Sequence, residues 1–264
     1  MPTKFDPTEI TAIVQNALDH AEVVWGRHRV ALEAHVRKSF TMDSAMQVAT
    51  NIPGFEFIKA NQEKVATFIA LVADIRESSD HLTCAISTKK AKVSELERVY
   101  YETSALLPAL ECTIQYEGGA VTEYLGDGIL ALFRVDDADK SAAIYAAHRA
   151  AKNCLLRSLE IVNDELASRY DLPPLQVGIG LAMSPALISL VGMPDAPHPK
   201  AIGRCVYYAT KLSAGYDEIV ADETLEREWP TKTGGTLRFI PCVKKKIPGF
   251  TIYKKSKAAH NILI

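Results

Sequence analysis

An apolar run of nine residues that ends in an aspartate constrains the fold of this chain most strongly. Residues 65–73 (VATFIALVA) are almost all apolar, and Asp74 follows directly. A run this short, without polar alternation, is typical of a β-strand that is covered on both faces. We therefore expect a layer of structure on each side of this strand.

A β-hairpin and a series of alternating elements follow this strand. Two apolar segments, residues 121–125 and 129–133, flank Gly126-Asp127-Gly128 and predict a hairpin. Periodicity predicts helices over about 79–87, 93–115, 140–170 and 203–214, and strands over about 176–182, 186–191, 218–221, 236–243 and 250–253. The order strand, helix, hairpin, helix, strand predicts an α+β fold, with a ferredoxin-like, mostly antiparallel central sheet and flanking helices.

The N-terminal part of the chain has a different pattern. Thr8 can cap a long amphipathic helix that runs to about residue 38, and a second short helix is expected from Asp43 until Asn51-Ile52-Pro53-Gly54 stops it. We expect residues 1–60 to form a helical extension and residues 61–264 to form the main domain. The apolar stripe of the long helix either packs on its own domain or on a second copy of the chain.

Composition and charge exclude several classes of protein. The net charge is −2 and 48% of residues are hydrophobic, which argues against a disordered chain and against a nonspecific nucleic-acid binder. The five cysteines form no CxxC pair, so neither a zinc site nor a disulfide framework is indicated. No signal peptide and no apolar run of about 18 residues is present, so we expect a cytoplasmic protein that does not insert into a membrane.

Two aspartates lie at the ends of predicted apolar strands. Asp74 closes the first strand and Asp127 lies at the hairpin tip, so both carboxylates are expected at the rim of one sheet. Taken singly, either aspartate can be a turn former or a helix cap. Taken together, two neighbouring carboxylates repel each other unless a cation lies between them, and a divalent metal is the usual cation. The glycines beside Asp127 allow the turn to close and a substrate to approach.

Several segments in this order resemble the catalytic domain of class III nucleotidyl cyclases. They are Ala73-Asp74-Ile75 and residues 118–133, 177–180, 202–206 and 249–253, so the resemblance spans about residues 65–253. It implies that residues 61–264 form a catalytic domain that cyclises a nucleoside triphosphate and releases pyrophosphate. It also implies two Mg²⁺ or Mn²⁺ ions per site, held by Asp74, Asp127 and the backbone carbonyl of Ile75, which activate the ribose 3′-hydroxyl and neutralise the triphosphate.

The resemblance also implies two phosphate contacts. Amides of Arg76, Glu77, Ser78 and Ser79 open the next helix and are expected to hold the phosphates. Lys244, which Lys245 and Lys246 follow before the last strand, is a candidate for the same role. The alternative is that this lysine run is simply solvated.

Base recognition is implied at Glu123 and Lys200. Glu123 stands four residues before Asp127, where the family reads the base, and Lys200 takes the second reading position. An ionised carboxylate only accepts hydrogen bonds and an ammonium only donates them, so the pair suits an N–H beside a carbonyl. Uracil and guanine both have that edge; adenine and cytosine fit less well. The alternative is that Glu123 is simply a polar residue of an exposed hairpin.

The helix over residues 203–214 departs from the family pattern. Tyr207 stands where the family has a ribose-orienting Asn, and Lys211 stands where it has an Arg for the α-phosphate. Arg204, Tyr207 and Lys211 are spaced i, i+3, i+7 and are expected on one helix face as catalytic residues. Tyrosine narrows the pocket, which favours UTP over GTP. The same substitutions are also compatible with reduced activity or a noncatalytic partner.

The family implies a homodimer with shared sites. Asp74 and Asp127 of one chain would meet Glu123, Lys200, Arg204, Tyr207 and Lys211 of the other; Glu123 and Asp127, if on one strand, would lie roughly 13 Å apart. Small cyclases with such altered helices resemble the pyrimidine cyclases of Pycsar antiphage defence, which implies a cyclic UMP signal that a separate effector reads. The alternatives are a guanylate or cytidylate cyclase, and a catalytically inert nucleotide-binding regulatory module.

Overall fold

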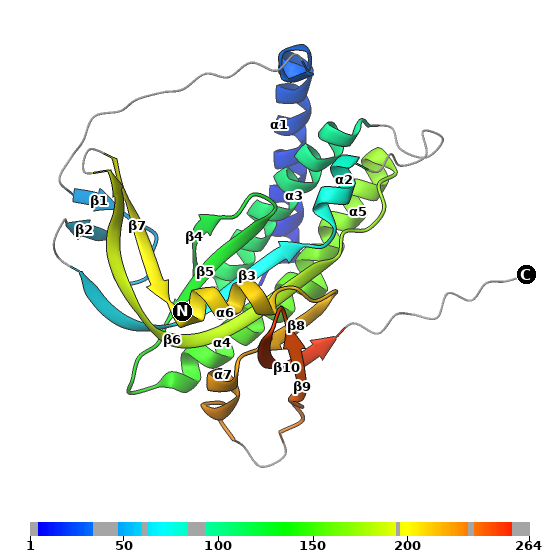
Figure 1. Cartoon of the computed structure of the whole chain (residues 1–264). Helices are drawn as coiled ribbons and strands as arrows, with labels where there is room; N and C mark the ends of the chain where they lie inside the picture. Colours follow the sequence, from blue (N-terminus) through cyan, green and yellow to red (C-terminus); the bar gives the residue numbers. More distant parts are fainter. Residues whose placement is uncertain are drawn as a thin grey trace, which may run out of the picture.

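The computed structural model describes residues 5–33, 47–59, 63–83, 93–193, 196–231 and 235–254. Its described strands include an eight-stranded sheet in the order β4-β5-β3-β6-β8-β10-β9, with β7 pairing β6 off this path. These strands are β3 (Lys64–Ile75), β4 (Ala120–Tyr124), β5 (Gly128–Arg134), β6 (Val177–Met193), β7 (Ala196–Gly203), β8 (Glu218–Ala221), β9 (Ile240–Lys244) and β10 (Ile247–Lys254). β6 and β8 are parallel and the other pairs are antiparallel, which confirms the predicted mostly antiparallel α+β sheet (Figure 1).

The central strand β3 is covered on both faces, as its apolar run predicts. Phe68, Ala70 and Val72 belong to one buried cluster, which includes residues of α6 (Arg204–Leu212). Ile69, Leu71 and Ala73 belong to the other cluster, which α3 (Glu95–Tyr116), α4 (Lys140–Asn153) and α5 (Leu159–Tyr170) cover. Because side chains alternate along a strand, Asp74 continues the row of Phe68 to Val72 and lies on the α6 face.

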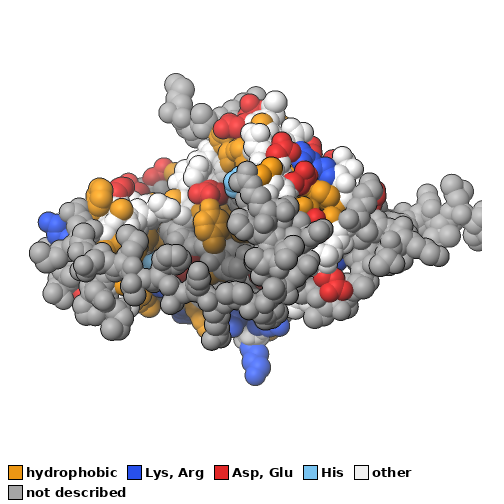
Figure 2. Space-filling view, turned by 90° about the horizontal axis from the view of Figure 1, so that it is seen from above, with side chains coloured by type: hydrophobic (Ala, Val, Ile, Leu, Met, Phe, Trp, Pro, Cys, Tyr) orange, Lys and Arg blue, Asp and Glu red, His pale blue; other side chains and the backbone are white. Residues whose placement is uncertain are grey.

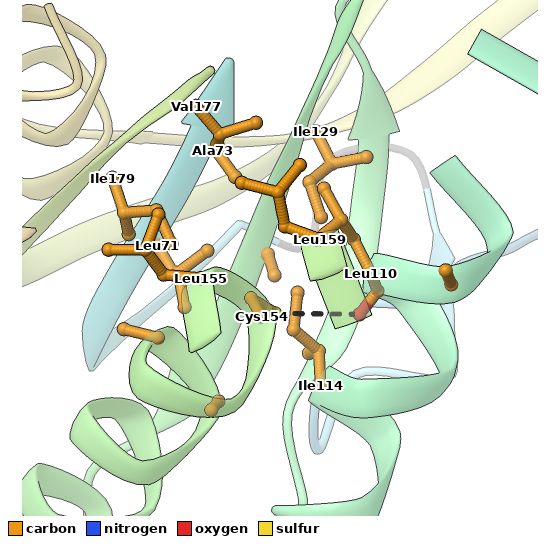
Figure 3. Close-up of a cluster of buried hydrophobic side chains, with 14 of the residues drawn as sticks. Leu71, Ala73, Leu110, Ile114, Ile129, Cys154, Leu155, Leu159, Val177 and Ile179 are labelled. Carbon is orange, nitrogen blue, oxygen red and sulfur yellow. Dashed lines mark hydrogen bonds between the residues drawn. The ribbon is translucent and has the colours of Figure 1, made fainter. Parts of the chain in front are cut away.

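The helical layer holds the larger of the two clusters. Figure 3 shows Leu71 and Ile179 of the sheet facing Leu155 and neighbouring helix residues, and the Cys154 thiol lies 4.0 Å from the Leu110 carbonyl oxygen. A single helix is expected over residues 140–170. The structure instead joins α4 to α5 through a π-helical segment, Cys154–Ser158, in which the buried Ser158 and Thr113 hydroxyl oxygens lie 2.6 Å apart.

The N-terminal helix α1 (Pro7–Glu33) packs on its own domain, one of the two predicted alternatives. Ile10, Val14 and Leu18 are fully buried against the helical layer. Polar contacts fix the same segment, including a hydrogen bond from the Tyr116 phenol to Glu9 and an ion pair between Arg169 and Asp19 at 2.6 Å. Figure 1 shows α1 running alongside α3.

The prediction of a second short helix from Asp43 is wrong for the part of that segment that the structure describes. Residues 43–46 lie outside the described residues, and Gln47–Ala49 forms β1, which pairs with β2 (Phe57–Lys59) across a turn in which Gly54 has φ +78°. Ile52 and Ile58 are buried with Phe68 in the cluster on the α6 face. Burial against the sheet therefore determines this segment, and residues 1–60 are not helical throughout.

The structure also corrects the reading of residues 176–203. One long strand, β6, runs through Pro185 where two strands are expected, and Pro197-His198-Pro199-Lys200 belongs to β7 where a loop is expected. Pro197 and Pro199 are two residues apart on β7, so their backbone nitrogens face the same side of the strand. Among the described strands of this sheet, β7 pairs with β6 alone, so its other side is an edge. Prolines are tolerated on an edge strand because their missing N–H groups face away from the ladder.

Candidate functional site

Two carboxylates meet at the end of β3. Asp74 pairs in register with Gly128 of β5, and Asp127 immediately precedes Gly128 in the hairpin turn. Burial raises the pKa of Asp74; the Arg76 guanidinium opposes this rise and the Asp127 carboxylate adds to it. The two aspartates are therefore close enough to repel each other, and the prediction that they lie together at one rim of the sheet agrees with the geometry.

Gly128 leaves the space in which Asp74 lies. A Cβ at position 128 would lie 2.6 Å from the Ala73 carbonyl oxygen and 2.9 Å from Asp74 Oδ1. On the other side of Asp74, a Cβ at Gly178 would lie 2.0 Å from the Ser213 carbonyl oxygen. Glycines on both neighbouring strands thus allow the backbone after α6 to approach β6 and keep the Asp74 carboxylate unobstructed.

Arg76 supplies the positive charge beside Asp74. Its guanidinium pairs with the Asp74 carboxylate, and its Nε donates to the Asp74 carbonyl oxygen at 3.3 Å. The Arg76 amide donates to the Gln176 carbonyl at 2.8 Å, so the prediction that this amide faces a phosphate is wrong. Glu77 has φ +58° and its carbonyl accepts the Asp80 amide at 2.8 Å, at the start of α2 (Ser78–Thr83). Phosphate contacts from Glu77, Ser78 and Ser79 stay predictions.

The donor set fits a hard divalent cation. Two mutually repelling carboxylates and a nearby backbone carbonyl, that of Ile75, are oxygen ligands of the kind that Mg²⁺ and Mn²⁺ prefer. Among the residues that the structure describes, no group of three or more His, Cys, Asp or Glu side chains is arranged to hold a metal. The ligands of any ion here therefore have to include backbone or substrate oxygens.

Glu123 and Lys200, the two predicted base-reading residues, lie in direct contact. The Lys200 ammonium donates to Glu123 Oε2 at 2.6 Å, and the Glu123 side chain is 16% exposed. Glu123 lies on β4 opposite Leu130, next to an irregularity in the register, whereas Asp127 lies in the turn beyond the strand. The expectation that Glu123 and Asp127 lie on one strand is therefore wrong.

Helix α6 lies on the same face of the sheet. Cys205, Ala209 and Leu212 are buried, and a Cβ at Gly180 would lie 2.0 Å from the Ala209 carbonyl oxygen, so the helix lies very close to β6. Tyr207 is 56% exposed, and the Lys211 ammonium lies 5.5 Å from the centre of its ring. These two predicted catalytic residues are thus held together by a cation–π contact.

Arg204 and Lys244 depart from the expected arrangement. Arg204 lies over the ring of Tyr208, 4.5 Å from its centre, so it does not join the pair of Tyr207 and Lys211. The Lys244 ammonium pairs with Glu218, whose side chain is 3% exposed. Lys244 is therefore neither a solvated lysine nor free for a phosphate, and a role in phosphate binding requires it to leave Glu218.

The site residues lie on the face of the sheet that α6 partly covers. Asp74 and Glu123 are on the α6 face, two strands and about two residue levels apart, which corresponds to about 12 Å. A hollow of about 510 Å³ lies elsewhere, beside Val65 and Arg134 at the opposite end of β3. Figure 2 shows acidic and basic side chains interspersed on the face seen from above, so no large field of one sign marks that surface.

Two curated relatives and several solved structures to which the chain is similar are nucleotide cyclases. The chain is 28% identical to a uridylate cyclase of Burkholderia cepacia over 188 residues, 69% of this chain and 75% of that protein. It is 25% identical to an adenylate cyclase of Anabaena cylindrica over 211 residues, 76% of this chain and 39% of that protein. The crystal structure of the guanylyl cyclase Cya2 superposes with a TM-score of 0.58 at 17% identity, covering 75% of this chain and 96% of that one.

Two negative findings accompany these similarities. No family model matches the chain. No helix among the described residues is long and apolar enough to cross a membrane. The fold is that of a class III cyclase domain, and the chain is similar in sequence to uridylate cyclase.

Proposed function

We propose that this chain, which has the fold of class III nucleotidyl cyclases, converts UTP to 3′,5′-cyclic UMP and pyrophosphate. The observation that carries the proposal is the juxtaposition of Asp74 and Asp127 on the sheet face that also presents the Glu123–Lys200 pair and α6. A metal-assisted attack of a ribose oxygen on a phosphorus atom needs hard oxygen ligands, cations near the phosphates and a base contact, and this face offers each of them.

The residues of the chain have separate tasks in this reaction. Asp74, Asp127 and the Ile75 carbonyl would hold Mg²⁺ or Mn²⁺, which acidifies the 3′-hydroxyl and neutralises the phosphates. The Arg76 guanidinium, which pairs with Asp74, would be available to the phosphates only when that ion pair opens. Lys211 would stabilise charge on the α-phosphate, and Tyr207, which the Lys211 ammonium already contacts, would orient the ribose.

The Glu123–Lys200 pair supports uracil as the base. Glu123 accepts and Lys200 donates at adjacent points, so a base edge that offers an N–H beside a carbonyl replaces their mutual contact without an unpaired group. Guanine has the same edge, and guanylate cyclase activity is therefore the alternative of the same class. The similarity to a uridylate cyclase supports UTP, and cytidine has the less suitable edge.

The catalytic unit in this proposal is a homodimer with two shared sites, each with the metal aspartates of one chain and α6 of the other. A dimer of an Asp74→Ala chain with a Lys211→Ala chain then retains one intact site. We expect the isolated heterodimer to have about half of wild-type activity, whereas each homodimer is inactive. An inactive heterodimer would show that each chain builds its own site.

The biological role follows from the same proposal. A cyclic UMP signal needs a separate protein that reads it, and the resemblance to pyrimidine cyclases supports a role in bacterial antiphage defence. Expression of the chain without an effector would then raise cyclic UMP but give no protection from phage.

A second candidate is an inert nucleotide-binding module. The observation in its favour is the Arg76–Asp74 ion pair, because Arg76 already supplies the charge that a metal would bring. One experiment separates the two. The purified protein is incubated with each ribonucleoside triphosphate and Mn²⁺, and products are identified by mass, with Asp74→Ala as the control. Cyclic UMP as the main product supports the proposal; cyclic GMP as the main product favours the guanylate reading, and binding without any product favours the inert module.

A further inference from the structure

The loop that follows α6 is tied to the turn that follows the metal-site aspartate. The Tyr216 phenol donates a hydrogen bond to Glu77 Oε1 at 2.9 Å, across 139 positions of sequence. The same hydrogen bond raises the pKa of Tyr216, and Arg76 and Asp80 also act on it electrostatically. Tyr216 therefore joins the loop after α6 to the β3–α2 turn.

The side chain of Asp217 reinforces this connection one residue further along the loop. Asp217 accepts hydrogen bonds from Gln176 Nε2 at 3.1 Å and from the Val177 amide at 3.3 Å. The Gln176 carbonyl in turn accepts the Arg76 amide. The loop after α6, the start of β6 and the β3–α2 turn thus form one hydrogen-bonded unit.

Two members of this unit, Glu77 and Asp217, have left-handed backbone conformations, with φ of +58° and +47°. This region is unfavourable for a residue with a side chain. Such a conformation persists only where surrounding contacts hold it. Two kinds of contact do so here: the Glu77 carbonyl accepts the amides of Asp80 and His81, and its carboxylate accepts the Tyr216 phenol.

We propose that Tyr216 is a positioning residue of the cyclase reaction, which holds the β3–α2 turn so that Asp74 and the start of α2 keep the geometry required for metals and phosphates. The inference rests on the proposed function. It assigns a role to a residue that is not itself proposed to contact the metals or the phosphates. Tyr216 acts on Asp74 of its own chain. In a shared-site dimer, α6 of that chain serves the other site, so the two effects of a Tyr216 substitution can be separated.

The first experiment measures metal binding without turnover. Mn²⁺ is titrated into the full-length wild type, Tyr216→Phe, Glu77→Ala and the double variant, with free Mn²⁺ followed by electron paramagnetic resonance. Loss of one exposed hydrogen bond to a charged group is expected to weaken Mn²⁺ binding about three- to tenfold. The double variant should bind Mn²⁺ no more weakly than the single variant that binds it more weakly. Tyr170→Phe, which removes a phenol–carboxylate bond to Glu22 of α1, is the control and should bind Mn²⁺ as the wild type does.

The second experiment compares two heterodimers that carry Tyr216→Phe on different chains. Tyr216→Phe is added either to the Lys211→Ala chain, which supplies Asp74 to the intact site, or to the Asp74→Ala chain, which supplies α6. The proposal requires a loss of activity only in the first arrangement, with a higher Mn²⁺ concentration for half-maximal rate. A loss in both arrangements indicates a general structural role, and a loss only in the second indicates an action through α6; either result overturns the proposal.

Failure of the proposed function is distinguishable from failure of this inference. A wild-type protein that forms no cyclic product from any triphosphate contradicts the proposed function, and the Mn²⁺ titration still tests Tyr216. An active wild type whose Tyr216→Phe variant binds Mn²⁺ normally contradicts the inference alone.

Discussion

The ammonium nitrogen of Lys200 lies 2.6 Å from a carboxylate oxygen of Glu123, although 77 positions separate the two residues in the chain. The contact joins β4 to β7, which are not neighbours in the sheet. A charged donor and a charged acceptor are thus held at one place on the α6 face.

Substitution of either residue should impair recognition of the base. Each of Glu123→Ala and Lys200→Ala is expected to raise the KM for UTP about tenfold, because each removes one charged hydrogen-bond partner. The double variant should show less than the product of the two effects, since the residues contact each other. Steady-state kinetics with UTP and GTP measure this. Arg149→Ala, which breaks the ion pair with Glu117 at 2.7 Å, is the control.

Gly128→Ala should lower activity at least about a hundredfold and also lower stability. The new Cβ would lie 2.6 Å from the Ala73 carbonyl oxygen and 2.9 Å from Asp74 Oδ1, so both the end of β3 and the carboxylate must move, and a displacement of about 1 Å in a catalytic group can cost about a hundredfold in rate. Gly126→Ala is the comparison in the same turn: its φ of +84° strains the backbone, but no atom lies within 4 Å of the added Cβ, so it tests backbone strain without a clash at Asp74. Equal activity of the two variants would contradict the role of Gly128.

Asp222 should make the stability of the folded protein depend on pH. Burial raises its pKa to about 6, against hydrogen bonds from the Leu225 and Met183 amides. The pKa of an aspartate in an unfolded chain is about 3.9. Between about pH 4 and 6, Asp222 therefore keeps a proton in the folded state that it has lost in the unfolded state. This group therefore lowers the free energy of unfolding as pH rises through that window, by about 3 kcal/mol in total.

Urea unfolding from pH 4 to 7 measures this effect. The difference between wild type and Asp222→Asn should grow through the window and then level off above about pH 6. Parallel pH profiles for the two proteins would show that Asp222 is not protonated in the folded state at the low end of the window.

Leu18→Ala should destabilise the whole chain. Leu18 is fully buried between α1 and the helical layer, and loss of such a side chain costs about 2 to 5 kcal/mol. If α1 is an integral part of the domain, urea unfolding should stay a single transition with a lower midpoint. Two separate transitions would instead identify α1 as an independent unit.

Local pattern predicts the core of the fold and the two neighbouring carboxylates at the end of β3. The run before Asp74 is apolar because β3 is buried on both faces, and Gly126-Asp127-Gly128 is a turn whose geometry the sequence itself indicates. The pairing of Glu123 with Lys200 cannot be read from local pattern, because it depends on how the β6–β7 ribbon folds back over the sheet. It follows only from the resemblance to a family.

Other elements escape prediction for identifiable physical reasons. The prolines at 197 and 199 suggest a loop, yet both fit an edge strand. Helix α7 (Glu223–Arg227) is short, and its one signal is Asp222, which accepts the Leu225 amide as an N-cap. The Tyr216–Glu77 contact depends on a left-handed backbone at Glu77. A glutamate in the sequence does not indicate that conformation.

The prolines of β7 also restrict how copies of this protein can assemble. An edge strand normally offers a row of N–H donors to which another strand can add, and this is a common route to aggregation. At Pro197 and Pro199 the outer edge of the β6–β7 ribbon has no such donors. A second molecule cannot extend the sheet there by continuous strand addition. A partner that contacts this edge must therefore do so through side chains.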